Sequence, residues 1–201
     1  MRMLAVALAA PLVIVCASAT VGLENELRAP DETAMKGVEI SREARLDELF
    51  RTLLSAQDEK TAKAAENGII ELWNESGSDT VDLLMKWTIE AIDAENYPLA
   101  LDFLDRITSL KPDYAEGWNK RATVYFLTED YAKSIADIER VLALEPRHFG
   151  ALSGLGTILR EIGEKKWAAE AYQRALTVDP HLDNVRKALD ELGEEGVGRA
   201  I

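Results

Sequence analysis

Three prolines recur at a fixed interval and constrain the fold more than any other feature. The interval from Pro112 to Pro146 equals that from Pro146 to Pro180 (146 − 112 = 34 and 180 − 146 = 34). Because proline cannot continue a helix, each one marks the end of a helical unit of constant length. A period of about 34 residues is typical of helix–turn–helix units that stack on one another. The sequence therefore predicts units over residues 81–114, 115–148 and 149–182.

Aligning the three units places small residues in shared columns, where two helices have to cross closely. The first-helix column holds Thr88, Ala122 and Gly156, and the second-helix column holds Ala100, Ser134 and Ala168. Together with Trp118, Tyr125 and Tyr172, this pattern resembles the tetratricopeptide repeat (TPR) family, and it extends over 102 residues (182 − 81 + 1). Arg121 departs from the pattern, because leucine is usual at its position.

The resemblance implies an all-α fold, a right-handed α-solenoid of helix–turn–helix units. A single repeat cannot bury its apolar face alone, so both ends of the stack need cover. Residues 41–79 are predicted to form a helical pair, a degenerate repeat that covers the first end. Residues 183–193 are predicted to form a capping helix over the other end, and residues 194–201 a loose tail.

The first residues predict export. Arg2, an apolar run over residues 4–15 and the small-x-small tripeptide Ala17-Ser18-Ala19 are typical of a cleavable signal peptide over residues 1–19. Lipid attachment at Cys16 is the alternative, and so is a retained anchor. Residues 20–40 are polar and predict a flexible leader. The expected location is the bacterial periplasm, with secretion as the alternative, and no membrane span is expected in the mature chain.

Charge and motifs argue against several functions. The chain has 36 acidic and 23 basic residues, a net charge of −13, which disfavours binding to nucleic acid. His148 and His181 fall in inter-repeat turns, where we expect them to face water, and no zinc-ligand spacing surrounds them. Asp93 and Glu95 lie in another turn that we expect to be solvated. We therefore expect no catalytic residues, metal, cofactor or small-molecule substrate, and no enzyme.

The four tryptophans divide into two groups. Trp73, Trp87 and Trp118 fall on apolar stripes, which predicts core positions. Trp167 shares its column with Leu99 and Lys133, and the lysine indicates solvent access there. Leu99 and Phe103, one helical turn apart, are a second candidate outer patch.

The TPR resemblance also implies a concave groove lined by the first helix of each unit. The residues one place beyond the core columns are predicted to face it: Met85, Ile89, Ile92, Asn119, Thr123, Phe126, Ser153, Thr157 and Arg160. Asp82, Met85 and Ile89 occupy much of the surface that would have to grip a C-terminal carboxylate. An apolar segment or an amphipathic helix is therefore the expected ligand.

These features predict a protein–protein interaction scaffold or adaptor in the bacterial cell envelope, which binds a peptide or helix of a partner in the groove. A periplasmic assembly chaperone that holds unfolded clients is the alternative. An envelope enzyme is a third possibility, which would require convergent polar side chains in a closed pocket.

Overall fold

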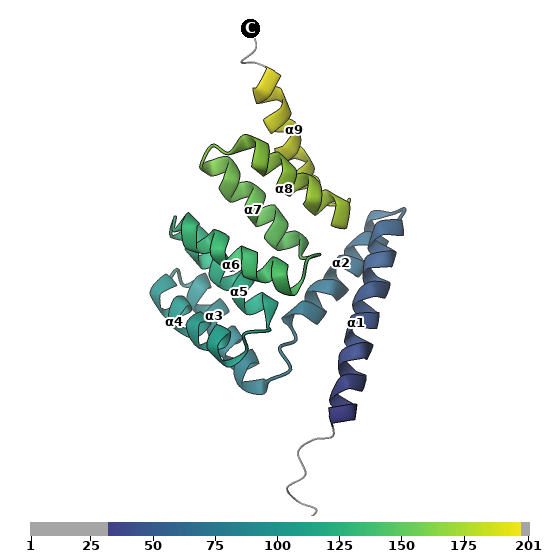
Figure 1. Ribbon diagram of the computed structural model, residues 1–201, viewed down its shortest axis with the longest axis vertical. Coiled ribbons are helices and arrows are strands. Elements are labelled where there is room, and N and C mark those ends of the chain that lie inside the picture. The colour runs from purple at the N-terminus through teal and green to yellow at the C-terminus, as the bar shows by residue number, and fades with distance from the viewer. Residues whose placement is uncertain (1–31, 198–201) are drawn as a thin grey trace, which may run out of the picture. The chain divides into compact units, whose positions relative to one another are not determined.

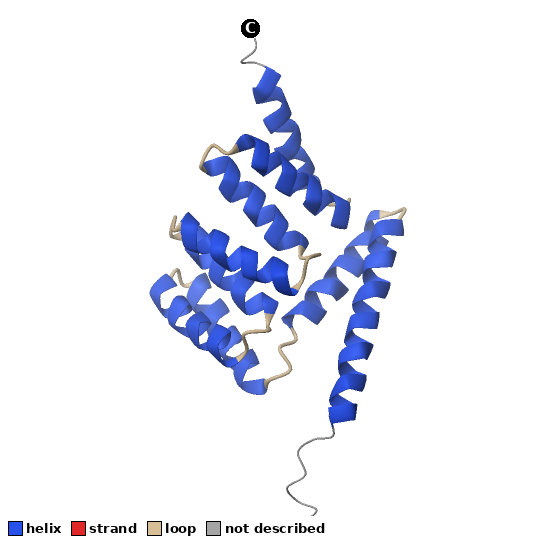
Figure 2. Cartoon of the chain, in the orientation of Figure 1, coloured by secondary structure: helices blue, strands red, loops and turns tan. Residues whose placement is uncertain are grey.

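The computed structural model describes the backbone of residues 32–197 and the side chains of residues 42–193. This part of the chain consists of α-helices joined by turns and contains no strand (Figures 1 and 2), which confirms the all-α prediction. The predicted signal peptide with Cys16, residues 20–31 of the leader and residues 198–201 of the tail lie outside the described residues. The chain divides into two compact units, residues 1–40 and 41–201, and the contacts below lie within the second.

The described helices follow the period of the prolines from α3 onward. The N-terminal pair is α1 (Glu32–Ser55) and α2 (Glu59–Asn74). Three pairs come next: α3 (Asp79–Asp93) with α4 (Tyr97–Leu110), α5 (Ala115–Leu127) with α6 (Tyr131–Leu144), and α7 (Phe149–Glu161) with α8 (Lys165–Val178). The last helix is α9 (Asp183–Val197). Residues 32–40, which were expected in the flexible leader, therefore belong to α1. Residues 194–197, which were expected in the loose tail, belong to α9.

Each turn inside a repeat ends its first helix in the same way. Glu95, Glu129 and Gly163 have positive φ angles of 55°, 60° and 85°. They occupy one column of the repeat (129 − 95 = 34 and 163 − 129 = 34). The residue after each donates its amide N–H back into the preceding helix, for example from Asp130 to the carbonyl oxygen of Tyr125 at 2.8 Å. This left-handed cap satisfies carbonyl groups at the helix end, so Glu95 is a turn residue.

The predicted small residues lie at buried helix crossings, as the column alignment indicated. Gly156 shows why size matters: a Cβ atom there would lie 2.4 Å from Cδ1 of Tyr172. Any larger residue would displace a tyrosine that is only 1% exposed. The crossing of α7 and α8 therefore requires glycine at this position.

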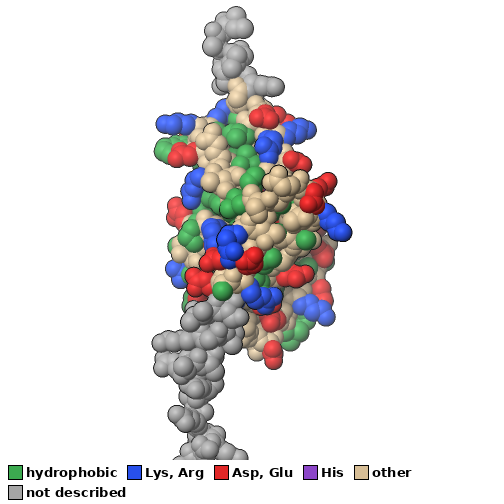
Figure 3. Space-filling model, turned by 90° about the vertical axis from the view of Figure 1, so that its right-hand side faces the viewer, with side chains coloured by type: hydrophobic (Ala, Val, Ile, Leu, Met, Phe, Trp, Pro, Cys, Tyr) green, Lys and Arg blue, Asp and Glu red, His purple; other side chains and the backbone are tan. Residues whose placement is uncertain are grey.

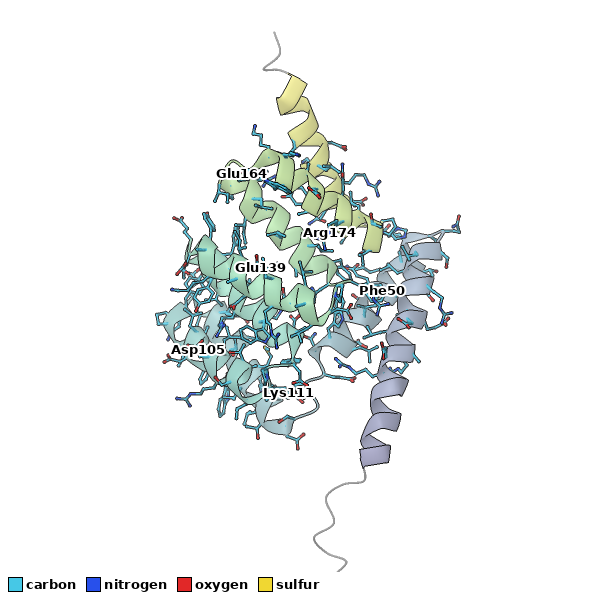
Figure 4. All side chains as sticks on the ribbon, in the orientation of Figure 1. Phe50, Asp105, Lys111, Glu139, Glu164 and Arg174 are labelled. Atoms are coloured by element: carbon cyan, nitrogen blue, oxygen red, sulfur yellow. The ribbon has the colours of Figure 1, made fainter. Side chains whose placement is uncertain are left out.

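The N-terminal pair does not cover the first end of the stack, so that prediction is wrong. Leu53, Ile69 and Trp73 of this pair form one apolar cluster with Phe149 of α7, and Val178 and Leu182 pack against it. Figure 4 labels Phe50, which reaches from α1 toward this cluster. The pair runs along the turns between repeats because these turns offer it a ready apolar surface.

The first end of the stack consequently exposes apolar side chains. Leu83 and Trp87 of α3 are 46% and 42% exposed, so the core position predicted for Trp87 is wrong. Its ring packs against Phe103 with centroids 5.8 Å apart, and Leu99 beside it is also exposed. Trp167 is 54% exposed, as its column indicated. No described helix is long and apolar enough to cross a membrane.

Arg121 joins three helices and explains its departure from the family pattern. Its Nε and Nη2 atoms donate to both carboxylate oxygens of Asp137 on α6, at 2.7 and 2.8 Å. Nη1 reaches Asp105 on α4 at 2.7 Å, and the guanidinium lies 4.7 Å from the ring centroid of Trp118. A leucine at this position could pack against Trp118 but could not bind the carboxylates of Asp137 and Asp105. The charged network therefore takes the place of a packing residue.

Gly156→Ala is predicted to destabilise the protein by about 1–3 kcal/mol, because the new methyl group overpacks the crossing with Tyr172. Gly154→Ala is the matched control, since its nearest neighbour would be Cδ1 of Ile138 at 3.9 Å. We expect that control to be neutral or to gain up to about 1 kcal/mol from helix propensity. Urea denaturation of the three proteins measures both values. Equal stabilities for the two variants would contradict the packing argument.

Asp137→Ala is predicted to cost about 3 kcal/mol, because it leaves the half-buried guanidinium of Arg121 without its bidentate partner. Asp105→Ala, on the same arginine, should cost less than about 1 kcal/mol, since the side chain of Asp105 is 62% exposed. Thermal or urea unfolding compares them. If Asp105→Ala lowered the free energy of unfolding as much as Asp137→Ala does, burial would not determine the strength of these ion pairs.

Candidate functional site

A hollow of about 200 Å³ lies between α5 and α7. Its rim carries Asn119, Thr123 and Phe126 from α5 and Thr157 from α7, and its floor comes from Ala122, Ser134, Ile138 and Ile158. Four of the residues predicted from the TPR resemblance are therefore brought together here. The floor is buried and apolar except for the hydroxyl of Ser134, and the rim mixes amide, hydroxyl and aromatic groups.

A second compartment of about 280 Å³ continues the groove between α7 and α9. Thr157 lines both compartments, and its hydroxyl lies 3.2 Å from that of Tyr172. Ser153 and Arg160, which were predicted for the groove, line the second compartment together with Lys187 and Glu191 of α9. The groove thus passes from an apolar hollow to a charged compartment.

The sequence analysis missed the contribution of α9. Lys187 falls in the column of Ser153 one repeat later (187 − 153 = 34), and Glu191 falls in that of Thr157 (191 − 157 = 34). Extending the repeat alignment by one more period predicts that both residues line the groove. The sequence predicts only a capping helix here, whereas its packing on α8 and its place in the groove make it the first helix of a further, incomplete unit.

The prediction for the first repeat is wrong at Met85. Met85 is only 6% exposed and belongs to the apolar core of α3 and α4, so it cannot line an open surface. Ile89 is 45% exposed but lines neither compartment. The two compartments therefore begin at α5.

A buried polar cluster lies beside the hollow and was not foreseen. His148 is 2% exposed, so the prediction that it faces water is wrong. Its ring stacks on Trp73 of α2, with centroids 4.1 Å apart and planes inclined by 8°. Nδ1 accepts the amide N–H of Ala151 at 3.1 Å, so the proton is on Nε2, which faces Glu116 at 3.2 Å.

Glu116 connects this cluster to the rim of the hollow. Its carboxylate accepts Nδ2 of Asn119 at 3.1 Å and lies 3.0 Å from Nζ of Lys120. Burial by itself would raise the pKa of the Glu116 carboxyl, but the hydrogen bond from His148 and the charge of Lys120 outweigh it, and the pKa is lowered. The carboxylate therefore stays ionised and holds the amide of Asn119 in place.

The geometry of this cluster is that of a structural joint. Neither Glu116 nor His148 lines the hollow or the second compartment. His181, the other turn histidine, is exposed as expected, yet its Nε2 lies 3.2 Å from the carbonyl oxygen of Leu53. Among residues 42–193 no three histidine or acidic side chains converge as a metal site would require.

The lowered pKa of Glu116 predicts a pH dependence. A carboxyl whose folded pKa lies below its usual value of 4.5 stabilises the fold above that value, and the stabilisation is lost as pH falls through the folded pKa. The difference in unfolding free energy between wild type and Glu116→Gln should therefore be constant from about pH 7 to 5 and should shrink below pH 4.5. Chemical denaturation at a series of pH values measures it. Glu139→Gln, on the exposed face of α6 (Figure 4), should show no such change, and a pH-independent difference at Glu116 would refute the assignment.

Comparison with known proteins agrees with this architecture. A tetratricopeptide repeat family model matches residues 121–183. A TPR repeat-containing protein of Rhizobium etli is 45% identical over 158 residues, which cover 79% of this chain and 78% of that protein. A small glutamine-rich tetratricopeptide repeat-containing protein of Mycosarcoma maydis is 27% identical over 100 residues, half of this chain and 28% of that protein.

Solved structures show the same fold at low sequence identity. The first TPR domain of Spaghetti (RPAP3), bound to the HSP90 peptide SRMEEVD, has a TM-score of 0.56 at 19% identity and covers 58% of this chain and 93% of that domain. The TPR2B domain of yeast Sti1, in a complex with an Hsp70 peptide, has a TM-score of 0.54 at 19% identity. The match covers 61% of this chain and 99% of that domain. The extent of the Rhizobium match and the repeat geometry together show that this chain belongs to the tetratricopeptide repeat family.

Proposed function

We propose that this chain binds a peptide or helical segment of another protein in the groove formed by α5, α7 and α9. The observation that carries the proposal is the continuity of the two compartments through Thr157, from a buried apolar floor to charged walls. An open, elongated surface of this kind suits a chain segment better than a small substrate, which usually needs enclosure. The peptide complexes of the two structural neighbours support the same use of the fold.

The charges in the second compartment favour a segment that is apolar at one end and polar or charged at the other. Arg160 is held only loosely, with Nη1 3.8 Å from Glu191 and Nη2 3.9 Å from Glu161. Lys187 makes no ion pair among the described side chains. Such groups can exchange a weak internal contact for one to the ligand at little cost. The face shown in Figure 3 carries interspersed acidic and basic side chains, with no extended region of one sign.

We further propose that the protein works in the bacterial cell envelope as an adaptor. The support is the signal-like segment at residues 1–19 and the similarity to a protein of Rhizobium etli. Fractionation of cells that express the full chain, compared with a chain lacking residues 1–19, tests the location. Equal amounts of both forms in the periplasmic fraction would contradict export by this segment.

The groove proposal predicts that Asn119→Ala combined with Phe126→Ala reduces recovery of a specific partner at least about tenfold, because both side chains form the rim of the hollow. The bait is the purified mature chain incubated with envelope extract, and recovered proteins are quantified by mass spectrometry. Leu127→Ala is the matched control, since this residue is 44% exposed on α5 and does not line the hollow. Unchanged recovery of every partner by the double variant would refute the groove proposal.

A second candidate function, an assembly chaperone that holds unfolded clients, rests on the apolar side chains at the first end of the stack. Leu83, Trp87 and Leu99 are all at least 40% exposed, and such patches bind other apolar surfaces. Suppression of aggregation of several unrelated denatured proteins would favour it. Selective capture of one folded partner would favour the adaptor.

A further inference from the structure

We propose that the hollow between α5 and α7 is an anchor pocket for one aliphatic side chain of the bound segment. This inference rests on the proposed function of the groove and specifies what its apolar compartment recognises. Its floor is formed by Ala122, Ile138 and Ile158, each no more than 3% exposed. The hollow of about 200 Å³ is ample for a leucine-sized group, since an apolar cavity of about 150 Å³ holds a benzene ring.

The hydrogen-bonding state of the walls favours an apolar guest. Ser134 donates its hydroxyl to the carbonyl oxygen of Ala122 at 2.7 Å. Thr123 and Thr157 donate theirs to the carbonyls of Asn119 and Ser153, at 3.0 and 3.1 Å. With these protons committed and no ionised side chain in the lining, only the rim amide of Asn119, which already donates to Glu116, could compensate a charged group for its lost hydration.

Two glycines on α7 keep the hollow open. Gly150 and Gly154 line it one helical turn apart, and the packing of the protein does not require glycine at Gly154. A Cβ atom there would meet only Cδ1 of Ile138, at 3.9 Å, an ordinary contact. A Cβ on Gly150 would meet the His148 ring at 3.4 Å. At Gly117, in contrast, the packing of the protein does require glycine, because a Cβ there would lie 2.7 Å from Cγ2 of Ile107.

Glycine inside a helix is costly in the free protein, at about 0.5–1 kcal/mol relative to alanine. At Gly154 no internal contact compensates for that cost. The missing side chain instead leaves room above Ile138 and lets the backbone of a bound segment approach α7 closely. The glycine is therefore explained by the ligand, whose inserted side chain would lie beside the rim residue Phe126.

N-acetyl-leucinamide is the probe for this pocket, and the δ1 methyl signals of Ile138 and Ile158 in NMR spectra are the readout. We expect saturable shifts of both methyls in the full mature chain. Gly154→Leu should weaken the apparent affinity at least about tenfold, because its own side chain fills the hollow. N-acetyl-glutamate amide, of similar length but charged, should leave both methyl signals unchanged.

Gly193→Leu is the matched control, since a Cβ at this exposed position on α9 meets nothing, and it should bind the probe like wild type. Gly154→Ala, which is expected to be at least as stable as wild type, fills the hollow less and serves if the leucine variant folds poorly; it should bind the probe with intermediate affinity. Absence of a saturable shift in wild type, or equal shifts in Gly154→Leu and wild type, would overturn the proposal.

The outcome is separable from that of the proposed function. A protein partner whose capture requires Asn119 and Phe126 but is unaffected by Gly154→Leu would leave groove binding intact and refute the anchor pocket. Probe binding that is lost in Gly154→Leu, without any groove-dependent partner, would support the pocket and refute the adaptor.

Discussion

The neutral imidazole of His148 connects three separate parts of this protein. One nitrogen caps the start of α7, the other faces Glu116 on α5, and the ring face stacks on Trp73 of α2. Each contact would be weak in water, but the ring is 2% exposed, and burial strengthens all three together. The N-terminal pair, the middle repeat and the last repeat therefore depend on the position of a single side chain.

The geometry of the groove depends on this buried contact of His148 with Glu116 and Trp73. Glu116 forms hydrogen bonds with both His148 and Asn119. The buried His148 therefore fixes the carboxylate, and the carboxylate fixes the side-chain amide of Asn119 at the rim. The apolar floor comes from helix crossings that only small residues permit, such as Ser134 and Ala122. A binding surface built in this way is largely preorganised, and a ligand would not have to order it.

Much of the fold could be predicted from periodicity. The prolines, the small-residue columns and the helical stripes follow from local rules that recur in every repeat, and the structure confirms the all-helical solenoid. The groove residues on α5 and α7 follow from the same columns, while Lys187 and Glu191 were missed because they lie one period beyond the three predicted units. The place of α1 and α2 could not be derived, since Trp73 meets His148 through packing that no spacing rule encodes. Burial of His148 and exposure of Trp87 follow from that one placement.

The path of the N-terminal pair changes how this solenoid should fold. In an ordinary repeat array each unit touches only its neighbours, so stability is a sum of local terms and the ends can fray independently. Here Asp47 pairs with Arg147, 100 residues away, and the carbonyl oxygen of Leu53 contacts His181, 128 residues away. Such distant contacts raise the contact order, which slows folding. They also tie the last repeat to the first helices of the described chain, so that an array of nearly independent modules becomes a single cooperative unit.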